Sequence, residues 1–344
     1  MQRLLFKVVS IWVQIRDLYL YIFRHAIIVN AWIDDHTWRG LNHRNWGDDI
    51  NYYFIKVLTR RPVISLYNFR LARRYRFKNY LCIGSLLGYP KYANKRTIVW
   101  GAGSFGEIKG LPPRHICSVR GKLTHDILIE KGMDCPKVYG DPALLLPLVY
   151  NPRERFKVTR LNSSASSQSS KFKVQSSIFQ DEKESLNTRN QELETKRYRL
   201  GIIPHVADQQ HPVIREIKEK YADEILVIDL ARYERWTDVI DQICSCERIL
   251  SSSLHGLIVS DAYQIPNCWV ELTGKIIGGH FKFFDYASSV ERRFINPIVI
   301  ETSKSITDLE EVSDAFSYAD ARKIQILQQG LLAVAPFDCK IRIC

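Results

Sequence analysis

The stretch ILSSSLHGLIVSDAYQIP, residues 249–266, predicts a point where a buried strand meets a helix. It begins with an apolar pair and passes through three serines and Leu254-His255-Gly256. It then has the pattern of a helix over residues 256–263, which Pro266 ends. Such a junction directs the first free backbone N–H groups of the helix, with their partial positive charge, into one crevice. The stretch therefore predicts a pocket for a phosphate or a carboxylate.

The side chains of this junction allow two interpretations. In the first, the three serines donate hydrogen bonds to an anion, His255 titrates near neutral pH, and Gly256 lets a ligand or a strand come close. In the second, a serine caps the helix and the histidine packs in the core. The serine cluster and its place in a loop favour the binding interpretation.

Outward from the junction, apolar runs alternate with helical patterns. We expect strands at residues 26–32, 80–83, 97–100, 117–121, 199–205, 224–230 and 267–272. Helices are expected at residues 50–58, 123–131, 213–221 and 236–244, with mostly helical patterns over 306–333. The aromatic residues 278–286, which begin with Gly278-Gly279, are expected to form a loop. Regular β/α alternation predicts an α/β fold with parallel sheets, in which ligands bind beyond the carboxyl ends of the strands.

A chain of 344 residues suits two domains of ordinary size. The predicted division is an amphipathic N-terminal helix (1–25), a first β/α domain (26–150), an insertion (151–199), a second β/α domain with the donor site (200–320), and a C-terminal helix and tail (321–344). The insertion contains nine serines and is otherwise charged and rich in Gln and Asn. Such a composition buries too little apolar surface to fold, so we expect a disordered linker without catalytic residues.

Residues 1–25 are apolar and aromatic but interrupted by charges at Arg3, Lys7, Arg16, Asp17 and Arg24. These charges argue against a membrane-spanning helix and against a signal peptide. Two interpretations remain for the helix. It can lie on an anionic membrane surface, or it can pack on its own domain or on a partner.

The net charge of +12 favours an anionic partner, such as a phosphorylated substrate or an acidic membrane surface. Nucleic acid is not expected, because the chain has no recognisable nucleic-acid-binding motif. The glycines at 101, 103 and 106 only approach a dinucleotide fingerprint, so we expect no nucleotide cofactor.

Of the eight cysteines, only Cys244 and Cys246 are close in sequence, and no second pair completes a zinc site. No metal is therefore expected. Free thiols in a reducing cytoplasm are the simplest account of the cysteines.

Arg120 lies at the end of the strand expected at residues 117–121. In that position its guanidinium can bind a phosphate or a carboxylate with two parallel hydrogen bonds. The alternative is an ion pair with a nearby acid such as Asp126.

An ordered set of short motifs resembles the polysaccharide pyruvyl transferase family, most of all its exopolysaccharide branch. The motifs are NWGDDIN (45–51), WGAG (100–103), VRG (119–121), GDPA (140–143), IPH (203–205), SLHGLIV (253–259), DAYQIP (261–266) and KFFDY (282–286). Apart from the insertion, the resemblance covers residues 27–296. Each motif alone is weak, and their order makes the set specific.

The resemblance implies two Rossmann-like β/α domains that face each other across a cleft, a GT-B-like fold. It also implies a reaction: the enolpyruvyl group of phosphoenolpyruvate moves onto two hydroxyls of one sugar and forms a pyruvate ketal. The acceptor would be a polysaccharide or its lipid-linked precursor, and no cofactor is implied beyond the donor substrate. We expect a cytoplasmic enzyme, peripheral at the inner face of the membrane.

The resemblance also assigns site residues. Arg120 and His255 would hold phosphoenolpyruvate, with help from backbone groups at Ser253 and Leu254. His255 is the candidate acid. Many relatives have an arginine where this chain has Ser253, so Lys282 and Arg120 are expected to carry more of the charge. The other substrate-binding positions carried over by motif are Asn45, Gly103 and Gly256.

On the acceptor side the candidates are His205 and Asp48. Asp48 and Asp49 have two interpretations: they cap the helix that follows, or one of them accepts a proton from a sugar hydroxyl.

Two other functions remain open from the sequence. One is a glycosyltransferase of GT-B fold with a nucleotide-sugar donor, which would bind uridine diphosphate and ignore phosphoenolpyruvate. The other is a non-catalytic scaffold of polysaccharide assembly, which would bind ligand without turnover.

Overall fold

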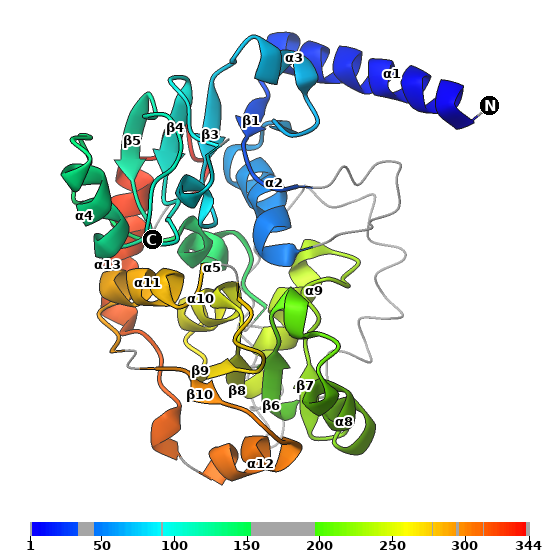
Figure 1. The fold of residues 1–344 in the computed structure, drawn as a ribbon, viewed down its shortest axis with the longest axis vertical. Helices are drawn as coiled ribbons and strands as arrows, with labels where there is room; N and C mark the ends of the chain where they lie inside the picture. The colour runs from blue at the N-terminus through cyan, green and yellow to red at the C-terminus, as the bar shows by residue number, and fades with distance from the viewer. Residues whose placement is uncertain are drawn as a thin grey trace, which may run out of the picture.

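Two parallel β-sheets of five strands each organise the chain (Figure 1). The computed structural model describes residues 2–33, 45–90, 92–152, 197–276, 278–293, 296–311 and 313–341. Most of the expected insertion, residues 153–196, lies outside the described residues.

The first sheet has the strand order β2-β1-β3-β4-β5, with all neighbours parallel. Its strands are β1 Ile27–Val29, β2 Val63–Ser65, β3 Asn79–Leu81, β4 Thr97–Trp100 and β5 His115–Ser118. Nearly every strand residue is buried, which explains why these strands are continuous apolar runs in the sequence. The sequence did not predict β2, a three-residue edge strand that directly follows Pro62.

The second sheet has the order β10-β9-β8-β6-β7 and is also parallel. Its strands are β6 Tyr198–Ile203, β7 Ile225–Val227, β8 Cys246–Ser251, β9 Asn267–Glu271 and β10 Ile298–Val299. Counted from the start of each half, both sheets have the order 2-1-3-4-5. In such sheets ligands bind where the winding reverses, between the first and third strands. For this chain those strands are β1 and β3 in one half and β6 and β8 in the other.

The helices follow the expected β/α alternation. They are α1 Gln2–Phe23, α2 Trp46–Thr59, α3 Arg70–Arg74, α4 Lys122–Glu130, α5 Leu146–Val149, α8 Pro212–Lys220, α9 Trp236–Cys244, α10 Leu254–Ala262, α11 Phe281–Val290, α12 Ser303–Glu311 and α13 Ala321–Ala333. Short 3-10 turns lie at Leu86–Gly88, Pro142–Leu145, Val206–Asp208 and Ser313–Ala315. The expected helices at 123–131, 213–221 and 236–244 agree with α4, α8 and α9 to within one residue.

Two expectations about local structure were wrong. Helix α2 begins at Trp46 rather than at residue 50, because the Asn45 side chain caps it by accepting a hydrogen bond from the Gly47 N–H (3.2 Å). Residues 278–286 were expected to form a loop, yet α11 begins at Phe281. Its buried residues Phe283, Tyr286, Ala287 and Val290 have helical spacing, and only Gly278-Gly279 before them has the positive φ of a loop.

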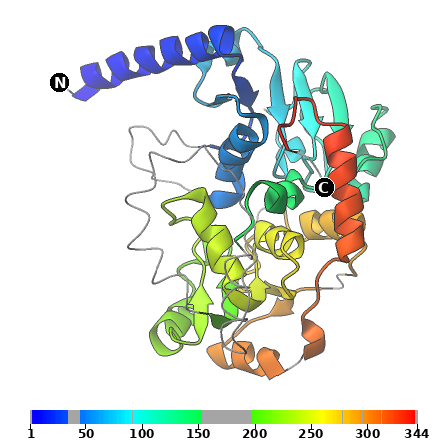
Figure 2. The same cartoon turned by 180° about the vertical axis from the view of Figure 1, so that it is seen from behind.

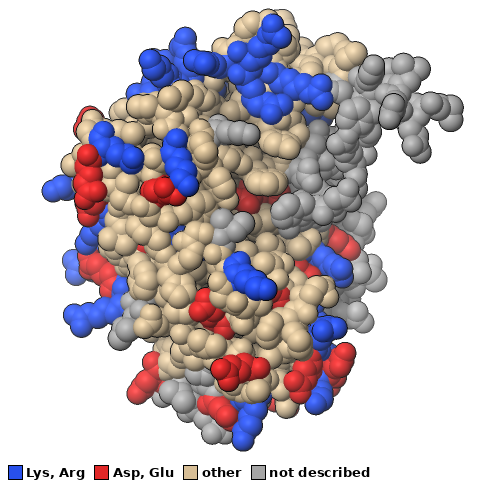
Figure 3. All heavy atoms as spheres, viewed as in Figure 1, with Lys and Arg blue, Asp and Glu red and all other residues tan. Residues whose placement is uncertain are grey.

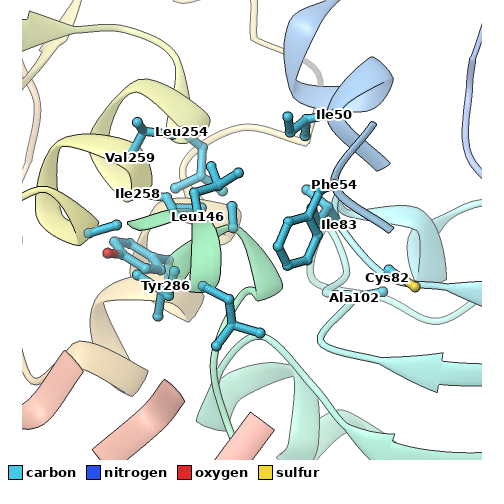
Figure 4. Packing of buried hydrophobic residues seen from close by; sticks show 14 of the residues in the cluster. Ile50, Phe54, Cys82, Ile83, Ala102, Leu146, Leu254, Ile258, Val259 and Tyr286 are labelled. Carbon is cyan, nitrogen blue, oxygen red and sulfur yellow. The ribbon is translucent and has the colours of Figure 1, made fainter. Parts of the chain in front are cut away.

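One hydrophobic core joins the two halves. Ile50 and Phe54 of α2 belong to the same buried cluster as Leu146 of α5 and Leu254 and Ile258 of α10 (Figure 4). The two domains therefore pack directly on each other where their loops meet.

Helix α13 crosses back from the second half to the first (Figure 2). The Trp100 indole donates a hydrogen bond to the Leu331 carbonyl (2.9 Å), and the Gln328 amide donates to the Leu144 carbonyl (2.7 Å). Two facing Rossmann-like domains, with a C-terminal helix that returns to the first, confirm the expected GT-B-like α/β fold.

Candidate functional site

The switch points of the two sheets lie opposite each other. Gly84 and Ser85 follow β3 in the first half, while His205 follows β6 and Ser252 follows β8 in the second. The N-termini of α2 and α10 meet at the same place, because the His255 ring of α10 lies against Gly47 of α2. Both helices therefore direct the positive ends of their dipoles toward this point.

The contact between His255 and Gly47 depends on the missing side chain. A Cβ atom on Gly47 would lie 2.0 Å from the His255 Nδ1 atom, so only glycine fits without a shift of the ring. The other ring nitrogen, Nε2, is buried and has no hydrogen-bond partner among the described residues. A buried nitrogen of this kind is costly unless something binds to it.

The serines of the junction mostly shape the loop. Ser251 Oγ donates to the Ser253 carbonyl (2.8 Å), and Ser252 Oγ donates to Asp208 Oδ2 (2.9 Å) while it accepts from the His205 N–H (2.9 Å). Ser253 is the N-cap of α10 but makes no capping hydrogen bond with its side chain. Gly256 faces the strand rather than an open space, since a Cβ there would lie 2.2 Å from Ser251 Oγ.

Arg120 is fully buried and held on three sides. Its Nε donates to Asp285 Oδ2 (3.0 Å), its Nη1 to Ser85 Oγ (2.7 Å) and its Nη2 to the Ser104 carbonyl (3.1 Å). The sequence suggested Asp126 as the alternative ion-pair partner, and this was wrong: the partner is Asp285, while Asp126 contacts His125.

Asp285 connects the two domains through this ion pair. One of its carboxylate oxygens accepts from the Thr124 N–H and the other from the Thr124 hydroxyl, each at 2.8 Å. Gly103 makes room for the guanidinium, because a Cβ there would lie 2.3 Å from Arg120 Cζ. Arg120 is therefore a fixed charge between α4 and α11.

Three further basic groups surround this charge, and each has a lowered pKa. Burial, and then the charge of Arg120, lower the pKa of Lys282 to about 8. Burial and Lys282 lower the pKa of His205 to about 4, and the same two causes lower the pKa of His255 to about 3. Basic groups this close together destabilise one another's charged forms, and a bound anion would stabilise those forms.

Asp48 is the carboxylate of this cluster. Burial and the neighbouring Asp49 raise its pKa to about 7, although a hydrogen bond from Asn45 Nδ2 (2.8 Å) and the charge of Lys282 act in the opposite direction. It lies in the first turn of α2, whose N-cap is Asn45. A carboxyl with this pKa can both give and take a proton at neutral pH.

Asp49 has a different environment. It is fully buried and accepts a hydrogen bond from the Tyr233 hydroxyl in the second domain. Next to it, the Trp46 indole donates to the Trp236 carbonyl (2.8 Å). Asp49 therefore serves the contact between the domains, whereas Asp48 lies within reach of the charge of Lys282.

The structure brings together most of the residues expected from the sequence. Asp48, Arg120, His205, His255 and Lys282 influence one another electrostatically, while Asn45 and Gly103 support two of them. The Leu254 side chain instead lies in the hydrophobic core.

The sequence analysis missed Gly47, Ser85 and Asp285. Gly47 lies inside the NWGDDIN motif, and Asp285 lies three residues after Lys282 in the KFFDY motif. Their places in these two motifs could have pointed to both residues. Among the described residues, no group of His, Cys, Asp and Glu side chains is placed to hold a metal ion.

Comparisons with known proteins place the chain in a family. The sequence profile of the family described as polysaccharide pyruvyl transferase matches residues 41–273, which contain all of these site residues except Lys282 and Asp285. A curated relative, the uncharacterized protein L143 of Acanthamoeba polyphaga mimivirus, is 36% identical over 93 residues, covering 26% of this chain and 31% of that protein. The chain thus matches about a third of that relative's length.

Two solved structures of the wall teichoic acid polymerase TagF are similar at 9% identity. They have TM-scores of 0.43 and 0.41, and each match covers 96% of this chain and 92% of the other.

Proposed function

Because this chain belongs to the polysaccharide pyruvyl transferase family, and is therefore a transferase, we propose that it transfers the enolpyruvyl group of phosphoenolpyruvate to a sugar. Two hydroxyls of one sugar residue would receive it as a pyruvate ketal, with release of phosphate. The observation that carries the proposal is the cluster of the buried Arg120 and Lys282 with the partly buried His205 and His255, at the meeting point of two helix N-termini.

The donor carries a phosphate and a carboxylate, which this cluster suits. His255 Nε2 and the first N–H groups of α10 offer hydrogen-bond donors to one anionic group. The Lys282 ammonium offers a positive charge. Because its pKa is lowered to about 8, a bound anion nearby would raise that pKa and stabilise the charged form. Arg120 already donates to Ser85, Ser104 and Asp285, so its part is a fixed positive charge behind the other groups.

The reaction needs one proton on carbon and two hydroxyls that lose their protons. A proton adds to the methylene carbon of phosphoenolpyruvate, and a sugar hydroxyl adds to the neighbouring carbon. The C–O bond to phosphate then breaks, and a second hydroxyl closes the ketal at the same carbon. Of the two hydroxyl protons, one balances the new methyl group and the other leaves with hydrogen phosphate.

Asp48 is the group that best fits the proton transfer. Its raised pKa keeps much of it protonated at neutral pH, and a bound anion nearby would raise that pKa further. His255 is neutral at pH 7 in this structure, so it can act as the acid only after the bound phosphate has raised its pKa. We therefore assign phosphate binding to His255 and proton delivery to Asp48, with the reverse assignment kept as the alternative.

The acceptor is proposed to be a sugar of a polysaccharide or of its lipid-linked precursor. His205, which follows β6, is the proposed base on the acceptor side, since its lowered pKa leaves it neutral and able to accept a proton. An enzyme of this kind would work at the inner face of the cytoplasmic membrane.

A phosphate-release assay with phosphoenolpyruvate and a panel of lipid-linked and synthetic glycosides tests the proposal. The expected result is phosphate release that depends on an acceptor, with a product that gains one ketal by mass spectrometry. Sugar transfer from uridine diphosphate sugars, without any response to phosphoenolpyruvate, would replace the proposal with a glycosyltransferase. Phosphoenolpyruvate binding without turnover on any acceptor would favour a scaffold.

A further inference from the structure

The first domain presents an apolar helix face beside a strongly basic helix, and the proposed reaction uses neither. Helix α1 extends from the end of the domain that also carries α3 (Figure 1). Its orientation is fixed, since Gln14 Nε2 donates to the Asn68 carbonyl (2.8 Å) and Tyr21 stacks on Phe77 with ring centres 4.9 Å apart. The buried residues Val13 and Asp17 lie on this attached side.

The opposite side of α1 is an exposed apolar stripe. It consists of Ile11 (60% exposed), Trp12 (61%), Ile15 (63%), Tyr19 (52%), Ile22 (50%) and Phe23 (67%). Spacings of three and four residues place these side chains on one face of the helix. The sequence allowed α1 either to pack on its domain or to lie on a membrane. In the structure α1 packs on its domain through one face only, and none of the described residues covers the apolar stripe.

After α1, the sequence contains a long segment in which every charged residue is basic. No Asp or Glu occurs from residue 50 to residue 106. The same range holds eleven basic residues: Lys56, Arg60, Arg61, Arg70, Arg73, Arg74, Arg76, Lys78, Lys91, Lys95 and Arg96. Much of the chain's positive net charge therefore comes from one part of the first domain.

Several of these basic side chains are exposed on and around α3. Arg70, Arg73, Arg74 and Arg76 all face solvent, and Figure 3 shows basic side chains gathered at this end of the molecule. In the same view the acidic side chains lie mostly over the second domain. The two ends of the visible face thus differ in charge.

Aromatic rings accompany the arginines. The Arg16 guanidinium lies 5.8 Å from the ring centre of Trp12, Arg73 lies 5.7 Å from Tyr67, and Arg74 lies 5.9 Å from Tyr75. Tyr67 and Tyr75 are themselves more than half exposed, at 55% and 64%. Tryptophan, tyrosine and arginine are the side chains that favour the boundary between lipid headgroups and acyl chains.

We propose that the apolar stripe of α1 and the arginines of α3 together form a docking surface for an anionic phospholipid bilayer. The stripe would lie at the boundary of headgroups and acyl chains, and the arginines would contact lipid phosphates. Within the described residues no helix is long and apolar enough to cross a membrane, so the contact is peripheral. A nucleic acid would suit the arginines but would leave six apolar side chains uncovered.

Flotation of the full chain with vesicles tests this surface. The wild-type chain should bind vesicles of phosphatidylcholine with about a third phosphatidylglycerol more tightly than phosphatidylcholine alone. The triple variant Arg70→Gln, Arg73→Gln, Arg74→Gln should lose affinity for the anionic vesicles roughly a hundredfold, at about fivefold for each charge. The matched control, Arg215→Gln, Lys218→Gln, Lys220→Gln, removes three exposed charges from α8 in the other domain and should bind as the wild type does.

A second variant tests the apolar stripe. Ile15→Ser, Tyr19→Ser, Phe23→Ser should reduce binding to both kinds of vesicle, and circular dichroism should stay unchanged because all three side chains are exposed. Brominated lipids should quench tryptophan fluorescence in the wild type, and most of that quenching should disappear in Trp12→Phe.

Three results would overturn the proposal. One is equal binding of the wild type to neutral and anionic vesicles, or binding to neither. Another is an equal loss of affinity in the α8 control, which would leave net charge as the sole cause. The third is tight binding of single-stranded nucleic acid, lost in the α3 variant, together with no vesicle binding. Phosphate release can be assayed separately on soluble glycosides, so failure here would leave the proposed reaction standing.

Discussion

The His255 imidazole lies directly on the backbone of Gly47, where a Cβ atom would be 2.0 Å from Nδ1. The contact joins the N-terminus of α2 in one domain to the N-terminus of α10 in the other. It fixes the distance between the two halves of the site, because neither helix can move closer without expelling the ring. Asp48, the proposed acid, is the next residue along α2, so its position depends on the same contact.

We expect Gly47→Ala to push the ring away and open the contact between the helices. Overpacking of a tight site costs about 1–3 kcal/mol of folding free energy, and turnover should fall more than stability because His255 and Asp48 shift together. Gly330→Ala is the matched control: it lies inside α13 with only an ordinary contact, 3.6 Å from Val138, and should gain about 0.5–1 kcal/mol. Denaturant unfolding and kcat measure both effects. Unchanged turnover in Gly47→Ala would show that the contact does not position the site.

We expect Asp285→Asn to destabilise the fold strongly. It removes the buried charge that faces Arg120 and weakens the hydrogen bonds to Thr124, and an uncompensated buried arginine costs about 3–5 kcal/mol. Glu224→Gln removes a carboxylate from the exposed pair with Arg199 and should change stability by less than about 1 kcal/mol. The difference in unfolding free energy between the two variants is the measurement. Similar small losses in both would mean that Arg120 is not held by Asp285 in solution.

The role of Asp285 shows which kind of contact the sequence could not predict. Arg120 and His255 were expected in the site because each lies in a short motif near the end of a strand, and strand ends meet at the switch point of a parallel sheet. The partner of Arg120 lies 165 residues further along the chain, and only the packing of α11 on α4 brings it close. No local pattern encodes such a pairing. The sequence therefore offered the nearer acid, Asp126.

Local structure was predictable where periodicity was strong and not where short-range signals competed. Helix α9 was predicted to the residue because its apolar spacing is regular. Helix α11 was missed because Gly278-Gly279 and a run of aromatic residues resemble a loop. The shared 2-1-3-4-5 order of the two sheets lay beyond prediction as well, since strand order depends on long-range pairing and the halves share no sequence repeat.

Donor binding should weaken as the pH rises through about 8. The pKa of Lys282 is lowered to about 8 by burial and by Arg120, so above that pH the side chain loses the charge that attracts the donor. Isothermal titration of phosphoenolpyruvate between pH 6.5 and 9.5 measures the effect. Lys282→Met should bind roughly ten- to a hundredfold more weakly at low pH and lose this pH dependence. A wild-type affinity that stays constant to pH 9.5 would remove Lys282 from the donor site.

The final prediction assigns the proton. If Asp48 protonates the methylene carbon, kcat/KM should fall as the pH rises through about 7, because the free enzyme then loses the acid form of a carboxyl whose pKa is raised by burial and by Asp49. Asp48→Asn should lower kcat by about a hundred- to ten-thousandfold and abolish that limb of the profile. A base at this position would give the opposite slope, with activity rising through the same pH range.

His255 variants separate this role from phosphate binding. Glutamine keeps a hydrogen-bond donor but cannot transfer a proton, so His255→Gln should retain most of the turnover, whereas His255→Ala should weaken donor affinity by roughly tenfold or more. Loss of turnover by a hundredfold or more in His255→Gln, with a nearly active Asp48→Asn, would reverse the two assignments. The imidazole would then have to gain its proton when the phosphate binds, so the pH limb would appear in kcat, and it would disappear in His255→Gln instead of in Asp48→Asn. The two variants, assayed over the same pH range, therefore decide which group carries the proton.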